Sequence, residues 1–81
     1  MGFSYVYIIQ SVNNPEHYYV GHTEDLHDRL KRHNAGEVPY TSKRRPWRIK
    51  TAIAFTESGQ AVRFERYLKT SSGRAFAKKR L

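Results

Sequence analysis

Short runs of β-branched and aromatic residues open the chain. Residues 4–10, SYVYIIQ, and residues 18–22, YYVGH, have the composition of strands. Between them lies the Asn-Asn-Pro stretch, which favours a turn because these residues adopt the tight backbone conformations that turns require. The two segments are therefore predicted to pair as an antiparallel hairpin across Val12 to His17.

A third strand is predicted over residues 47–55, WRIKTAIAF, after a loop rich in Pro and polar residues. Apolar and polar positions alternate along this segment with the period of a strand whose one face is buried. The alternation predicts that one face carries Trp47, Ile49, Ile53 and Phe55.

Three segments have helical signals. Thr23 is expected to cap a first helix over about residues 24–35, which ends before Gly36. Ser58 or Thr56 can cap a second helix that runs to about Lys69, and Ser71 or Ser72 can open a third through FAKKRL. The order β-β-α-β-α-α predicts one α/β domain over residues 1–81.

Composition narrows the classes of function. With no cysteine, the chain has no disulfide framework and no thiolate zinc site, and the four histidines lack zinc-site spacing, so no structural zinc is expected. No apolar run is long enough to cross a bilayer, and the first residues do not form a signal peptide. We therefore expect a soluble, cytoplasmic protein with no membrane partner.

The charge balance favours a polyanionic partner. Fifteen Lys and Arg against seven Asp and Glu give a net charge of +8, which favours nucleic acid through release of counterions. A cationic surface that only keeps the chain solvated is the alternative. The candidate nucleic-acid-binding residues form a loop cluster and a C-terminal cluster: Lys43, Arg44 and Arg45, and Arg74, Lys78, Lys79 and Arg80.

Helical periodicity places three polar side chains on apolar helix faces. Arg29 and His33 share a face with the leucines of the first helix, and Glu65 lies within the apolar arc of the second. Arg29 can be a rim residue with its apolar stem buried, or a functional cation. Glu65 can pair with a buried cation such as Arg29, or bind a divalent metal.

The ordered set Tyr5-Val6-Tyr7, Tyr19-Val20-Gly21, Arg29, His33 and Glu65 resembles the signature of the GIY-YIG endonucleases. The resemblance spans almost the whole chain. The chain is similar to the small stand-alone members of this superfamily and, more distantly, to the N-terminal nuclease domain of a bacterial excinuclease. The resemblance implies a three-stranded antiparallel sheet flanked by helices, and hydrolysis of phosphodiester bonds, with DNA as the expected substrate.

The resemblance also implies roles for individual residues. Glu65 would bind one divalent cation, Mg²⁺ or another such as Mn²⁺, and Arg29 would stabilise charge in the transition state. Tyr7 would orient or deprotonate the attacking water, with Tyr19 and His22 around it. His33 would contact phosphate or assist proton transfer.

Two positions depart from the family pattern. Tyr5 replaces the Gly that opens the first motif, and no Asn follows Asn34, although many members carry an active-site Asn after the Glu. A binding module that keeps the fold and the basic surface without turnover is therefore the second hypothesis. A protein-interaction adapter, which would show no salt-dependent binding to nucleic acid, is the third. The sequence leaves the oligomeric state open.

Overall fold

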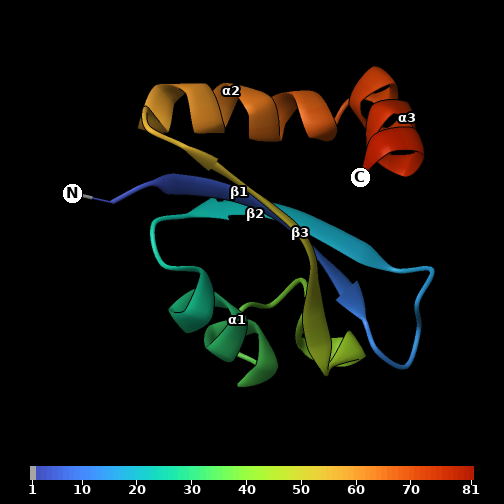
Figure 1. The fold of residues 1–81 in the computed structure, drawn as a ribbon. Helices are drawn as coiled ribbons and strands as arrows, with labels where there is room; N and C mark the ends of the chain where they lie inside the picture. The colour runs from blue at the N-terminus through green and yellow to red at the C-terminus, as the bar shows by residue number, and fades with distance from the viewer. Residues whose placement is uncertain (1) are drawn as a thin grey trace.

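A computed structural model describes residues 2–81 of the chain. Three strands and three α-helices follow one another in the predicted order β-β-α-β-α-α (Figure 1). Their bounds are β1 Ser4–Ser11, β2 Tyr18–Thr23, α1 Leu26–Asn34, β3 Trp47–Phe55, α2 Ser58–Leu68 and α3 Ser71–Arg80, with a 3-10 turn, η1, at Ser42–Arg44. No helix within residues 2–81 is long and apolar enough to span a membrane.

The strands form one antiparallel sheet in the order β2-β1-β3, as the resemblance implied. The first hairpin pairs Tyr7 with Gly21 and Ile9 with Tyr19, so the predicted β1–β2 pairing is confirmed. The central strand, β1, is buried at nearly every position because helices cover both of its faces. This explains why β1 is a nearly continuous apolar run, whereas β3 alternates.

Each face of the sheet has its own core. Val6 and Ile8 pack against Ala61 and Leu68 of α2, with residues of α3 around them. On the opposite face, Tyr7, Ile9 and Trp47 pack against the leucines of α1. Figure 1 shows the corresponding layers, with α1 below the sheet and α2 and α3 above it.

The prediction that one face of the third strand carries Trp47, Ile49, Ile53 and Phe55 is wrong. Trp47 and Ile49 belong to the α1 core, whereas Phe55 packs in the α2 core and Ile53 pairs with Val6, which faces α2. The register of β1 with β3 shifts between Ile8 and Ile9, where Lys50 is the extra residue. An inserted residue reverses the alternation of side chains, so one strand contributes to both cores.

The helix caps differ by one or two residues from the prediction. Asp25 caps α1 by accepting a hydrogen bond from the Asp28 amide at 3.0 Å, while Thr23 instead accepts one from the Asp25 amide. Thr70 caps α3, where Ser71 or Ser72 was expected, and accepts a bond from the Gly73 amide at 3.1 Å. Side-chain oxygens of several neighbouring residues can reach the same free amides, so sequence alone cannot choose among them.

The two helical glycines provide a test of the α2–α3 junction. A methyl group on Gly73 would overlap the Tyr67 carbonyl at the end of α2, so Gly73→Ala should destabilise the protein by about 1–3 kcal/mol. Gly59, near the start of α2, meets only the flexible end of Arg63 at 3.6 Å. Gly59→Ala should therefore be neutral or stabilise the chain by up to about 1 kcal/mol, because Ala is the better helix former. Urea unfolding of both variants checks this, and equal effects would contradict the close packing of α3 against α2.

Candidate active site

Polar side chains gather where β2, the edge strand, meets α1 on one face of the sheet and α2 on the other. Tyr7 comes from the neighbouring central strand and is only 2% exposed. Its hydroxyl reaches toward β2 under Gly21, where a Cβ atom would lie 2.5 Å from that oxygen. Gly21 is therefore needed because any side chain would push the Tyr7 ring away from β2.

A buried chain of hydrogen bonds runs from Tyr7 through α1 to the following loop. The Tyr7 hydroxyl lies 2.8 Å from Nε2 of His33, and Nδ1 of His33 lies 2.8 Å from Oγ1 of Thr41. Thr41 donates its own hydroxyl proton to the Val38 carbonyl at 3.3 Å, so it accepts from His33. His33 thus carries its proton on Nδ1, and Nε2 accepts the proton of Tyr7.

Burial sets the protonation of both partners. It raises the pKa of Tyr7 to about 12, although the positive charge of Arg29 opposes the shift. It also lowers the pKa of His33, which is only 1% exposed, and Arg29 adds to that effect. At pH 7 the pair is therefore a neutral tyrosine bonded to a neutral histidine.

Arg29 lies half-buried beside Tyr7, in a small recess between α1 and the sheet that Leu26 and Ile49 also line. Within residues 2–81 no carboxylate forms an ion pair with Arg29. The interpretation that Arg29 pairs with Glu65 is therefore wrong. Its charge instead acts on Tyr7 and His33.

The side chains of His22 and Lys69 flank Glu65 of α2. One carboxylate oxygen bonds Nδ1 of His22 on β2, and the other lies 2.8 Å from Nζ of Lys69, one helical turn further along. The Glu65 side chain is 14% exposed, and its partners are about half exposed. Burial raises the pKa of Glu65, but the bonds and charges of Lys69 and His22 outweigh burial and hold it below its ordinary value. Glu65 is therefore ionised at neutral pH.

Tyr19 connects these groups. Its ring meets the ring of His33 edge to face, with 5.2 Å between the centroids, and Nζ of Lys69 lies 5.9 Å from the Tyr19 centroid. Tyr7, Tyr19 and His33 thus form one cluster, which meets the Glu65, His22 and Lys69 cluster at the edge of β2. Helical phase had placed Arg29, His33 and Glu65 on inner faces. The fold brings His33 and Glu65 to this edge from opposite sides of the sheet, while Arg29 lies beside Tyr7 in the recess under α1.

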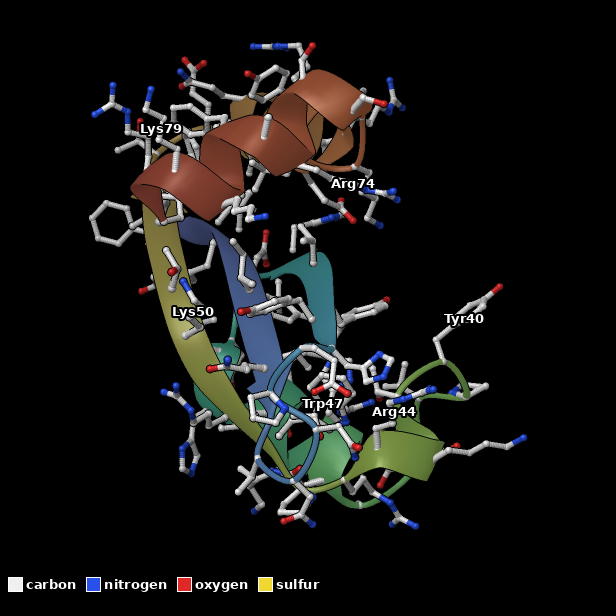
Figure 2. All side chains as sticks on the ribbon, turned by 90° about the vertical axis from the view of Figure 1, so that its right-hand side faces the viewer. Tyr40, Arg44, Trp47, Lys50, Arg74 and Lys79 are labelled. Carbon is white, nitrogen blue, oxygen red and sulfur yellow. The ribbon has the colours of Figure 1, made fainter. Side chains whose placement is uncertain are left out.

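The basic clusters lie apart from each other. Figure 2 shows Arg44 near Trp47 at the α1 end of the molecule, and Arg74 and Lys79 on α3 at the other end. One donor of the Arg45 guanidinium is already used within the loop, because its Nε donates a hydrogen bond to the Ser42 carbonyl at 2.8 Å. The remaining members are exposed: Lys43, Lys78 and Arg80.

Three contributors to the site escaped the sequence analysis. Lys69 could have been found, because it follows Glu65 by four residues on one helix face. Gly21 stood in the motif without an assigned reason, which is the approach of Tyr7. Thr41 carries no sequence signal, because only the fold of the loop brings it to His33.

Glu65 is the residue that could hold a metal ion. No group of three or more His, Cys, Asp or Glu side chains with metal-site geometry occurs among residues 2–81. A single carboxylate nevertheless fits Mg²⁺, which keeps several waters and takes its other oxygen ligands from substrate phosphate. Lys69 extends from the surface and can leave the carboxylate without disturbing the core.

The depressed pKa of His33 predicts a pH-dependent stability. The unfolded chain binds a proton at His33 near pH 6.5, whereas the folded chain does so only at lower pH. The free energy of unfolding should therefore fall as pH drops below 6.5, until the folded-state pKa is reached. Urea unfolding between pH 7 and 5 should show a shallower decline for His33→Gln than for the wild type. His27→Gln, at an exposed position, should behave as the wild type does, and equal declines for all three would contradict the buried neutral His33.

Comparison with known proteins identifies the arrangement. Residues 3–80 match the GIY-YIG catalytic domain. The chain is 36% identical over 66 residues to the UPF0213 protein YazA of Bacillus subtilis, which covers 80% of this chain but 65% of that protein, just under two thirds. A UPF0213 protein of Halalkalibacterium halodurans is 35% identical over 86% of this chain and 73% of its own length. Another, of Staphylococcus haemolyticus, is 36% identical over 89% and 87%. This chain belongs to the GIY-YIG family and has its nuclease-type fold.

Proposed function

We propose that this chain is a divalent-metal-dependent endonuclease that hydrolyses phosphodiester bonds in nucleic acid, with DNA as the substrate. The observation that carries the proposal is the ionised Glu65 carboxylate at the edge of β2, next to the buried Tyr7–His33 pair. A negative carboxylate attracts a hard cation, and the buried pair can accept a proton. Metal-assisted hydrolysis of a phosphodiester by water uses both functions.

Glu65 would hold the cation, Mg²⁺ or Mn²⁺, after Lys69 moves aside. When bound, the cation would polarise the scissile phosphate and stabilise the leaving oxygen. Arg29, which forms no ion pair with a carboxylate among residues 2–81, would balance the negative charge that develops on the phosphate oxygens. A guanidinium suits this role because its planar fork of donors matches two phosphate oxygens at once.

Tyr7 would transfer the proton of the attacking water. With its pKa at about 12, Tyr7 is not a tyrosinate at neutral pH, so it cannot act as a preformed base. Instead, its oxygen would take the water proton while its own proton passes to Nε2 of His33, 2.8 Å away. The water oxygen would bond to phosphorus while the bond to the leaving oxygen breaks, and the leaving oxygen would take its proton from solvent, with the exposed His22 ring beside it. Tyr19 would orient the phosphate beside His33.

A non-catalytic nucleic-acid-binding module is the second candidate. Two observations favour it: His22 and Lys69 occupy both oxygens of Glu65, and no Asn follows Asn34. Asn34 itself does not substitute, because its side chain brackets the start of β3 through bonds to both backbone groups of Trp47. Under either candidate we propose that residues 1–81 work as one domain in the cytoplasm and that the basic clusters bind the nucleic-acid backbone.

Replacing Glu65 tests the catalytic role. Glu65→Gln keeps the shape but removes the charge, so cleavage of plasmid and branched DNA with Mg²⁺ or Mn²⁺ should fall by about 100-fold or more. Stability should fall by only about 1 kcal/mol or less, since both ion-pair partners are about half exposed. Glu57→Gln, at the exposed start of α2, is the matched control and should retain activity. A folded Glu65→Gln protein that cuts as fast as the wild type would refute the mechanism.

Salt dependence tests the electrostatic footprint. If about four phosphates are neutralised, log K for duplex DNA should fall with log salt at a slope of about −3.6. Changing Lys43 and Arg44 together to Gln should make the slope shallower by about 1.8. The control double variant, Lys31→Gln with Arg63→Gln, removes the same charge from exposed positions outside both clusters. Affinity that does not change with salt would exclude nucleic acid, and an unchanged slope in the loop variant would remove that cluster from the footprint.

A further inference from the structure

A groove of about 940 Å³ lies between the sheet and the helices α2 and α3. Its apolar floor includes Ile8 and Val20 from the sheet and Leu68 from α2. It opens on the face of the sheet opposite the Tyr7–His33 pair, because Ile8 faces α2 whereas Tyr7 faces α1. The mechanism proposed above makes no use of this groove.

The rim of the groove is strongly basic. Its lining includes Lys50 of β3, Lys69 at the C-terminal cap of α2, and Arg74 and Lys78 of α3, while Glu16 is the one acidic residue in that lining. Figure 2 shows Lys50 on the sheet below Arg74 and α3. Cations from three different elements thus surround an apolar floor, so the groove is complementary to a ligand that is both anionic and flat-faced.

An aromatic ring is exposed within this basic groove. Tyr18, at the start of β2, is 52% exposed and lines the groove. Nζ of Lys50 lies 6.0 Å from the centroid of the Tyr18 ring, and the Tyr18 hydroxyl accepts a hydrogen bond from Nε2 of Gln10 at 3.4 Å. The contacts with Gln10 and Lys50 therefore hold the Tyr18 ring in place, while about half of the residue stays accessible. An accessible ring beside cations is the feature on which single-stranded nucleic acid stacks its bases.

The groove continues into the candidate active site. Lys69 lines the groove and also bonds Glu65 at 2.8 Å, and Tyr19 lines the groove and also contacts His33. A strand lying in the groove would consequently pass Lys69 before it reached Glu65. When Lys69 leaves the carboxylate, the phosphate of such a strand is the anion nearest to it.

The dimensions of the groove select between nucleic-acid forms. It lies between two layers of a molecule that measures 31 × 31 × 18 Å. A pocket of about 940 Å³ is large enough to enclose one drug-sized ligand, so this groove can hold a short stretch of one strand but cannot enclose a duplex. A single strand, whose bases can turn toward the floor and whose phosphates can face the rim, can enter it.

Resting on the proposed nuclease function, we propose that this groove binds an unpaired strand adjoining the scissile phosphate, with one base stacked on Tyr18. Lys50, Arg74 and Lys78 contact the phosphates of that strand. The substrate class is therefore nucleic acid with a single-stranded segment beside the cleavage site.

The test is binding of a fluorescently labelled single-stranded oligonucleotide and of a blunt duplex of the same length, measured in EDTA so that no cleavage occurs. Tyr18→Leu should weaken single-strand binding by at least about fivefold, the lower end of what one lost base–aromatic stack costs. It should leave duplex binding unchanged. Lys78→Gln should make the single-strand salt slope shallower by about 0.7.

Two controls match these variants. Tyr40→Leu alters a tyrosine that is 87% exposed but lies outside the groove, and Lys31→Gln removes an equal charge from the outer face of α1. Both should bind the single strand as the wild type does. Equal losses of single-strand affinity in Tyr18→Leu and Tyr40→Leu would overturn the groove assignment. Equal losses of single-strand and duplex affinity in Tyr18→Leu would overturn it as well. If circular dichroism shows that Tyr18→Leu is unfolded, Tyr18→Phe replaces it, and weak single-strand binding by Tyr18→Phe, which keeps the ring, would also overturn the assignment.

The same variants separate this proposal from the nuclease function. If the wild type cleaves duplex DNA with Mg²⁺ and Tyr18→Leu leaves both that rate and single-strand affinity unchanged, the groove assignment fails and the nuclease stands. If no substrate is cleaved although Tyr18→Leu loses single-strand affinity, the nuclease fails and the groove assignment stands. Binding of an unrelated acidic peptide at the affinity of the oligonucleotide would overturn the groove proposal in favour of a protein partner.

Discussion

Burial of β1 on both faces is the constraint on which the rest of this structure depends. A strand in the middle of a three-stranded sheet, covered by α1 on one side and by α2 and α3 on the other, is favoured to be apolar along its middle, as β1 is from Tyr5 to Ile9. In a chain of 81 residues this arrangement supplies both cores from a single strand. Any polar atom within β1 therefore needs a partner inside the protein.

Tyr7 brings such a polar atom into β1, and its surroundings explain the shape of the site. The hydroxyl is satisfied by His33, which is satisfied in turn by Thr41. No buried side-chain polar atom within residues 2–81 is left without a partner. A satisfied chain of this kind holds its members in one geometry, so the same bonds that stabilise the α1 core also fix the direction in which a proton can move.

The sheet separates the two charges, those of Arg29 and Glu65, that the proposed chemistry uses. Arg29 lies on the α1 side of the sheet, in a recess with Tyr7 and Ile49, and Glu65 lies on the α2 side at the edge of β2, where it bonds His22 and Lys69. If Arg29 had paired with Glu65, each would have quenched the other. Because the two are kept apart, neither neutralises the other, and Tyr19 connects the two sides through its contacts with His33 and Lys69.

The periodic segments of the sequence determined the element order, the hairpin and the inner faces of the helices, since period and turn chemistry are local properties. The ordered set from Tyr5 to Glu65 was also sufficient to indicate the family, because the motif residues lie in sequence order on those elements. Side-chain partners, in contrast, were decided by the tertiary structure.

Glu65 could be placed on an inner face, but only the position of α2 over the edge of β2 gave it His22 rather than Arg29. The extra residue at Lys50 turned β3 from one core to the other although its alternation never breaks. Thr41 became part of the site only when the loop after α1 folded back onto His33. A contact across many residues depends on how layers pack, and no local pattern records that packing.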